Sequence, residues 1–124
     1  MTMDRVYSVE EANALLPELR ERLARIRDAR QTMLRHAEVV RDRLARDGGG
    51  AHPGAEYLEA TATLRREIER LADEEIVLRD PESGLVDFLG ERDGERVWLC
   101  WLVGEDRVGH WHPLDTGFSG RRPL

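Results

Sequence analysis

The dipeptide Asp93-Gly94 lies between two apolar runs and constrains the fold of this chain more than any other feature. A two-residue turn of type I′ needs positive φ at both central residues, a conformation that Asp-Gly adopts readily. A second turn at residues 104–107 returns the chain to a third apolar run. The sequence therefore predicts a three-stranded antiparallel β-meander across residues 84–112.

The first hairpin also fixes a cross-strand register. With that dipeptide at its centre, Arg92 lies opposite Glu95, and Glu91 lies opposite Arg96. Opposite charges stabilise such cross-strand pairs. One face of the sheet then carries five apolar residues: Val86, Phe88, Val97, Leu99 and Trp101. The other face carries Leu85, Leu89, Trp98, Cys100 and Leu102, with Asp87 among them.

In a sheet with one solvated face, apolar and polar residues alternate along each strand. The predicted strands do not alternate in this way, because both of their faces are mostly apolar. We therefore expect both faces to be covered. A pair of helices can cover one face, and a second copy of the chain or a ligand can cover the other. Because large exposed apolar patches are rare in monomers, this pattern predicts a homodimer.

The composition narrows the class of protein. A net charge of -6 and an isoelectric point of about 5.3 argue against nucleic-acid binding, which requires a basic surface. All 19 basic residues are arginine, so Schiff-base chemistry and a Walker-type phosphate loop are excluded. A single cysteine cannot form an internal disulfide, which fits a reducing cytosol. The chain has neither a long apolar run nor a signal-peptide pattern, so we expect a soluble cytoplasmic protein without a membrane partner.

The start of the first helix has a clear signal. Ser8 and Glu11 have the spacing of a capping box, in which each side chain bonds the backbone N–H of the other residue. Pro17 follows within the helical pattern and removes one internal hydrogen bond. We therefore expect a kink or a break near Leu15-Leu16.

Two stretches with alternating three- and four-residue spacing predict a long antiparallel helical hairpin, similar to a coiled coil. The first seam is Leu16, Leu19, Leu23, Ile26, Arg30, Met33, Ala37, Val40 and Leu44. The second, on a helix over residues 55–75, is Tyr57, Thr61, Leu64, Ile68 and Leu71. The charged member of the first seam, Arg30, is expected to pair with Glu67 or Glu74, and residues 48–54 are expected to form a flexible turn.

These elements predict an α+β fold in a single domain over residues 1–124. An N-terminal arm and the helical hairpin occupy residues 1–79, and the β-meander and C-terminal tail occupy residues 80–124.

Three motifs are similar to those of a known family. They are Val9-Glu10-Glu11-Ala12-Asn13-Ala14-Leu15-Leu16-Pro17, Gly84-Leu85-Val86-Asp87-Phe88, and Trp111-His112 followed by Gly117-Phe118-Ser119-Gly120-Arg121. Together they resemble the small bacterial family called domain of unknown function 2203, or DUF2203, over nearly the whole chain. The resemblance implies no activity that can be carried over. It does imply that the C-terminal motif distinguishes the family more than the helices do.

His110 and His112 are the sharpest candidates for metal ligands. Residues two apart on a strand point to the same face, so both imidazoles can bind one divalent metal ion. A third ligand is needed, and the nearby options are Asp87, Glu91, Asp115 and Cys100. The alternative is that both histidines are partly buried and hydrogen-bonded to backbone.

The register of the third strand decides among these options. If His110 lies opposite Trp101, it points away from Asp87 and Cys100. If it lies opposite Cys100 instead, it shares a face with Asp87. The sequence leaves both registers open. Cys100 itself is more typical of a small buried hydrophobic residue than of a nucleophile.

Asp87 and the C-terminal arginines are candidate ligand-binding residues. A carboxylate in an apolar strand is costly unless it is paired, so Asp87 is either a ligand or general base, or the ion-pair partner of Arg121 or Arg122. The two arginines suit a small anion, because guanidinium groups bind carboxylates and phosphates. The alternative is a solvated tail that is docked by Phe118 and Pro123.

Three functions follow from these candidates. The first is a homo-oligomeric binding module that holds a metal or small anion at the C-terminal sheet and tail, through His110, His112, Asp87, Asp115, Arg121 and Arg122. The second is a dimeric scaffold that contacts another protein and has no ligand chemistry. The third is a small metal-dependent enzyme that uses His110, His112 and Asp87.

Overall fold

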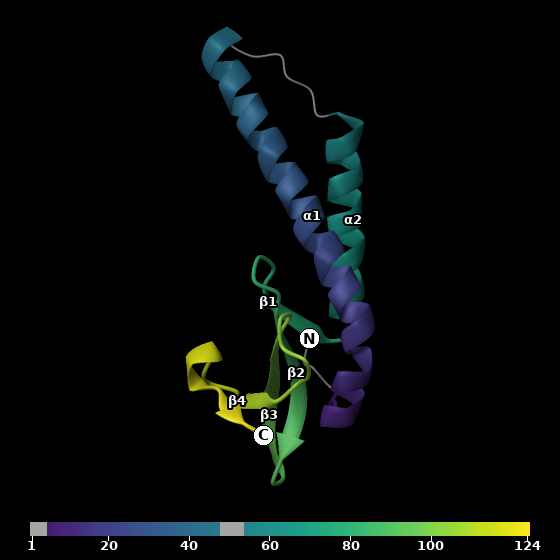
Figure 1. Cartoon of the computed structure of the whole chain (residues 1–124), viewed down its shortest axis with the longest axis vertical. Coiled ribbons are helices and arrows are strands. Elements are labelled where there is room, and N and C mark those ends of the chain that lie inside the picture. The colour runs from purple at the N-terminus through teal and green to yellow at the C-terminus, as the bar shows by residue number, and fades with distance from the viewer. Residues whose placement is uncertain (1–4, 48–53) are drawn as a thin grey trace.

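A helical hairpin stands on one side of an antiparallel sheet in the computed structural model, which describes residues 5–47 and 54–124 (Figure 1). The helices are α1 (Val9–Asp47) and α2 (Ala55–Asp73). The sheet has the order β1-β2-β3-β4-β5, with β1 (Ile76–Asp80), β2 (Leu85–Arg92), β3 (Glu95–Leu102), β4 (His110–Pro113) and β5 (Arg122–Pro123). A short 3-10 helix, η1 (Phe118–Gly120), precedes the last strand. Figure 1 shows this C-terminal segment on the side of the sheet away from the helices.

The helix α1 begins as its capping box predicts. The Glu11 N–H donates to Ser8 Oγ at 3.0 Å, and the Ser8 N–H donates to Glu11 Oε1 at 2.9 Å. The helix then continues through Pro17 as one element, so the alternative of a break was wrong. Leu16 and Leu19, which flank the proline, are both buried in the core, and this packing offsets the hydrogen bond that proline removes.

The meander forms with the predicted register, although the sheet has five strands and not three. Asp93 and Gly94 both have positive φ, at 53° and 81°, and Arg92 lies opposite Glu95 as expected. The strand β1 adds to the outer edge of β2, with Ile76 opposite Phe88. The strand β5 pairs with β4 over two residues only. The strand β5 has only two residues, and β1 begins with three consecutive apolar residues, so neither shows a period-two pattern, which explains why the predicted number was wrong.

The hydrophobic core lies between the helices and one face of the sheet. Its largest members from the sheet are Val86, Phe88, Leu99 and Trp101, and the helices contribute Leu16, Leu19, Leu23, Ile26 and Leu71. The second helix differs from its predicted seam at one position: Ile68 was expected to be buried but is 43% exposed. Ala60 and Glu67, which were not in the predicted seam, are buried. Coiled-coil packing of the hairpin stays a prediction.

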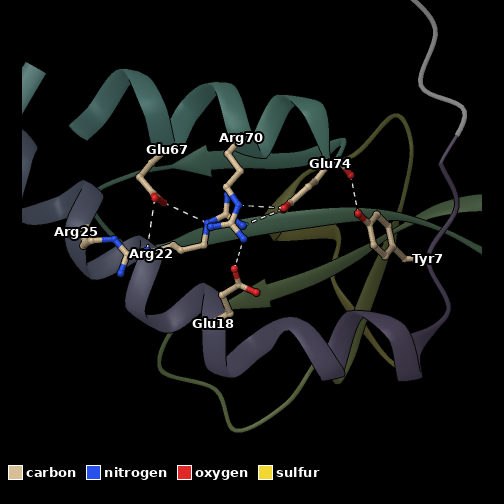
Figure 2. Close-up of polar contacts among 7 residues, drawn as sticks. All are labelled: Tyr7, Glu18, Arg22, Arg25, Glu67, Arg70 and Glu74. Carbon is tan, nitrogen blue, oxygen red and sulfur yellow. Dashed lines mark hydrogen bonds and ion pairs between the residues drawn. The ribbon is translucent and has the colours of Figure 1, made fainter. Parts of the chain in front are cut away.

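A buried arginine joins the two helices at the base of the hairpin (Figure 2). Arg22 has a side chain that is 2% exposed; its Nε donates to Glu67 at 3.2 Å, and its Nη1 donates to Glu74 at 2.8 Å. Glu67 also accepts from Arg25, and Arg70 contacts both Glu74 and Glu18.

Arg30 does not take part in this cluster. It lies 3.9 Å from Glu82, so the predicted pairing with Glu67 or Glu74 was wrong. Arg22 already binds both acids, and it lies about two helical turns before Arg30 along α1. The turn predicted for residues 48–54 lies outside the described residues, except for Gly54.

Candidate metal centre

The sheet face that is turned away from the helices carries a row of polar residues. Asp87 on β2 lies opposite Cys100 on β3, and Cys100 lies opposite His110 on β4. His112 lies in the next row, opposite Trp98. Residues that pair across antiparallel strands share a face. The chain has therefore adopted the second of the two open registers, in which His110 shares a face with Asp87.

Asp87 is the centre of this polar cluster. Its side chain is 2% exposed, yet it accepts from three groups. His112 Nε2 lies 3.1 Å and 3.2 Å from its two oxygens, and Arg79 Nε donates to Oδ2 at 2.9 Å. The Cys100 thiol also donates to this carboxylate. The structure thus confirms that Asp87 is paired with an arginine, but that arginine is Arg79 and not Arg121 or Arg122.

The His112 ring is held so that its Nε2 points at the carboxylate. Its other nitrogen, Nδ1, lies 2.9 Å from the Pro113 carbonyl oxygen. Both ring nitrogens therefore face oxygen acceptors, and a lone pair on either one would meet another lone pair. A proton or a metal ion between Nε2 and the Asp87 carboxylate would remove this repulsion. A backbone carbonyl that orients Nδ1–H in this way is the usual support of a metal-bound histidine.

Cys100 is fully buried beside this pair. Burial and, to a lesser extent, the neighbouring Asp87 charge together raise the pKa of the thiol to about 12. The residue is therefore a neutral thiol near neutral pH, which excludes an activated nucleophile. A bound cation reverses this preference, because metal coordination deprotonates a thiol outright.

Three donors of different kinds converge here. One ligand atom from each of Asp87, Cys100 and His112 lies within 4.8 Å of the other two, and all three residues are buried. Ligands around a tetrahedral zinc ion are roughly 3.3 Å apart when bonds are of normal length. The separation of 3.1 Å between Nε2 and Oδ2 is close to that value. A thiol, an imidazole and a carboxylate together suit Zn²⁺ or another late transition metal.

Two of the other predicted site residues, His110 and Arg121, meet at Glu105. His110 Nδ1 is 3.5 Å from Glu105, and Arg121 donates to the same carboxylate at 2.6 Å. The pKa of Glu105 is lowered, because hydrogen bonds from the Leu102 N–H and from Arg121 outweigh the opposing effect of partial burial. Arg121 also stacks on Phe118, with its Cζ 4.7 Å from the ring centroid.

Asp115 and Arg122 lie apart from the three donors. Asp115 is exposed in the turn that follows β4. The Arg122 guanidinium lies over the Trp111 ring, with its Cζ 5.3 Å from the centroid. A role for these two residues in binding stays a prediction.

Sequence reasoning missed two residues of the cluster. Arg79 lies on β1, next to a bulge at which the pairing with β2 shifts between Leu78 and Asp80. Because β1 was not predicted as a strand, nothing indicated that Arg79 meets Asp87. Glu105 lies in the second turn, where an acidic residue is ordinary, and only the course of the tail brings Arg121 to it.

Comparisons with known proteins identify a family and nothing closer. A family model described as an uncharacterized conserved protein, DUF2203, matches residues 5–124. No curated protein and no solved structure matches the chain. In the parts of the chain that the structure describes, neither helix is long and apolar enough to cross a membrane.

Proposed function

We propose that this chain, which belongs to the DUF2203 family of uncharacterised conserved proteins, binds a divalent transition-metal ion at Asp87, Cys100 and His112. The observation that carries the proposal is the orientation of His112, whose Nε2 is aimed at a buried carboxylate beside a buried thiol. Three protein donors leave a fourth position for water or for a ligand, as in catalytic zinc sites. Because catalytic zinc sites share this open fourth position, a metal-dependent enzyme is the second candidate function.

The proposed ligands differ from those expected from the sequence, in which His110 and His112 both bind the metal ion. His112 stays a ligand, while His110 lies opposite Cys100 and is a neighbour of the site. Asp115, Arg121 and Arg122 stay candidates for contacts with a molecule that approaches the bound ion from the tail.

Cobalt titration tests the donor set. We expect the wild-type protein to bind one equivalent of Co²⁺ and to show thiolate-to-cobalt charge-transfer absorption, because Cys100 supplies sulfur. In Cys100→Ser this absorption should be lost. His112→Gln should weaken Zn²⁺ binding by more than the 10- to 100-fold that is typical when a supporting residue is changed.

The matched control is His110→Gln, a change of the same kind two residues away on the same strand. We expect its Zn²⁺ affinity to stay within a few-fold of the wild type. If His110→Gln and His112→Gln lose Zn²⁺ affinity equally, both histidines bind the ion. A wild-type protein that takes up no cobalt or zinc would leave the scaffold as the better explanation.

We also propose that the chain forms a homodimer through the distal half of the hairpin. The α1 seam continues through Ala37 and Leu44, which are both exposed, and Figure 1 shows the two helices diverging there. Leu58 on α2 is exposed at the same end. Residues 34–46 contain four arginines and two acids, whereas the first turns of α2 contain Glu56 and Glu59. This difference in charge favours α1 of one copy against α2 of another.

Light scattering tests the dimer. We expect twice the mass of the 14.2 kDa chain at micromolar concentration, and the monomer mass for Leu44→Glu, because a charge cannot be buried in an apolar seam without a large cost. Leu114→Glu is the matched control, since Leu114 is exposed to a similar extent and directly follows β4, outside the helical hairpin. A wild-type monomer at this concentration would contradict the proposal.

A further inference from the structure

Arg79 joins the buried donors to the protein surface. Its side chain is 42% exposed, while the Asp87 side chain that it contacts is 2% exposed. The Arg79 Nε donates to Asp87 Oδ2 at 2.9 Å, and its guanidinium lies over the Trp98 ring with Cζ 4.9 Å from the centroid. One face of the guanidinium is therefore held by an indole, and one edge is held by a carboxylate.

A metal ion at the three donors has to share this carboxylate with Arg79. Both Arg79 and His112 already contact Oδ2. A divalent cation bound to Asp87 lies within a few ångströms of the guanidinium and repels it, and it also withdraws charge from the oxygen that the guanidinium uses. The imidazole can remain as a ligand of the ion, but the guanidinium has no lone pair to offer.

We infer that Arg79 is a displaceable partner of Asp87, and that a cation bound at Asp87, Cys100 and His112 frees the guanidinium to bind an oxyanion beside Trp98. The inference rests on the proposed metal function. A carboxylate and a thiolate together balance a divalent ion, so the loaded site leaves the charge of Arg79 without a counter-ion. Arginine stays charged under all ordinary conditions, and its planar fork matches the two oxygens of a carboxylate, phosphate or sulfate.

Stacking on Trp98 keeps the freed side chain in place. A cation over an indole ring is attracted to its face, which reduces the freedom that the guanidinium loses when an anion binds. The metal-loaded protein therefore has an oxyanion site that the metal-free protein fills with Asp87. Metal and anion should bind with positive coupling, and thermodynamic linkage makes the coupling factor the same in both directions.

The first arm of the test measures Zn²⁺ affinity by calorimetry in buffer without oxyanions. Arg79→Met removes the competitor for Asp87 and retains an unbranched side chain over Trp98. We expect it to bind Zn²⁺ at least about 5-fold more tightly than the wild type, the lower end of ordinary coupling between sites. Arg92→Met is the matched control, because the Arg92 guanidinium lies over another indole, 4.8 Å from the Trp111 centroid. Its Zn²⁺ affinity should be unchanged.

The second arm titrates inorganic sulfate into the metal-free and the Zn²⁺-loaded protein. We expect sulfate to bind the loaded wild type at least about 5-fold more tightly than the metal-free form, and to strengthen Zn²⁺ binding by the same factor. Both effects should disappear in Arg79→Met and persist in Arg92→Met.

The outcomes separate this inference from the metal proposal. If neither the wild type nor Arg79→Met binds Zn²⁺, the metal function itself is wrong. If both bind Zn²⁺ with equal affinity, Arg79 does not compete for Asp87 and the inference fails. If sulfate coupling persists in Arg79→Met, the anion binds the metal directly, and this also overturns the role of Arg79.

Discussion

Arg22→Met is expected to lower the free energy of unfolding by about 3–5 kcal/mol, the usual loss when one partner of a buried ion pair is removed. The side chains of Arg22 and Glu67 are 2% and 5% exposed, so water cannot replace the lost contact. The variant leaves the Glu67 carboxylate in the core with a single contact from Arg25, at 3.5 Å. Glu74 is affected less, because it is more exposed and also binds Arg70.

The double variant Arg22→Met with Glu67→Met separates the penalty of an unpaired charge from the value of the pair. Replacing both partners of a buried pair with apolar residues of similar size is often neutral or stabilising. We therefore expect the double variant to recover most of the stability that either single variant loses. Urea denaturation followed by circular dichroism measures all three proteins, and the difference between them is the coupling energy.

Arg25→Met is the matched control for this series. It makes the same change three residues along α1 and removes a contact to the same carboxylate, but Arg25 is 48% exposed. Exposed ion pairs contribute about 0–1 kcal/mol, so the variant should stay within that range of the wild type. Equal losses for Arg22→Met and Arg25→Met would show that Glu67 is solvated in solution, and that Arg22 does not hold the hairpin.

The hairpin register was predictable because local chemistry determines it. The Asp-Gly turn and the cross-strand charge pairs act within a few residues, and they place Asp87 opposite Cys100 without reference to the rest of the chain. The third strand has no such short turn, so its register had two solutions one residue apart. A shift of one residue moves every side chain to the other face. Whether His110 would share the face of Asp87 was therefore beyond sequence reasoning.

The side chains that were missed depend on contacts between distant elements. Arg22 lies beside the predicted seam, and arginine is almost never fully buried unless it is paired. Its burial requires two acids, Glu67 on α2 and Glu74 at the C-cap of that helix, to contact it together. Arg79 reaches Asp87 because β1 has an irregular register at this point. Neither contact leaves a periodic pattern in the sequence.

The pH dependence of metal binding is the second large effect, and it follows from the burial of Cys100. The pKa of the free thiol is raised to about 12, mainly by desolvation, so the metal-free protein keeps this proton at neutral pH. Only the thiolate binds metal, so each bound ion must release the thiol proton. Zn²⁺ affinity should therefore rise about tenfold per pH unit for this proton alone, and fall by the same factor as pH is lowered.

Calorimetry in buffers of different ionisation enthalpy counts the protons that are released. We expect the wild type to release the Cys100 proton with each Zn²⁺ that binds, because the buried thiol keeps this proton until the ion takes its place. Cys100→Ser should release one proton fewer, since a serine hydroxyl binds the ion without losing its proton. His110→Gln, which leaves the three donors in place, should release the same number as the wild type. If Cys100→Ser and the wild type release equal numbers, the thiol does not bind the ion, and the donor set is wrong at Cys100.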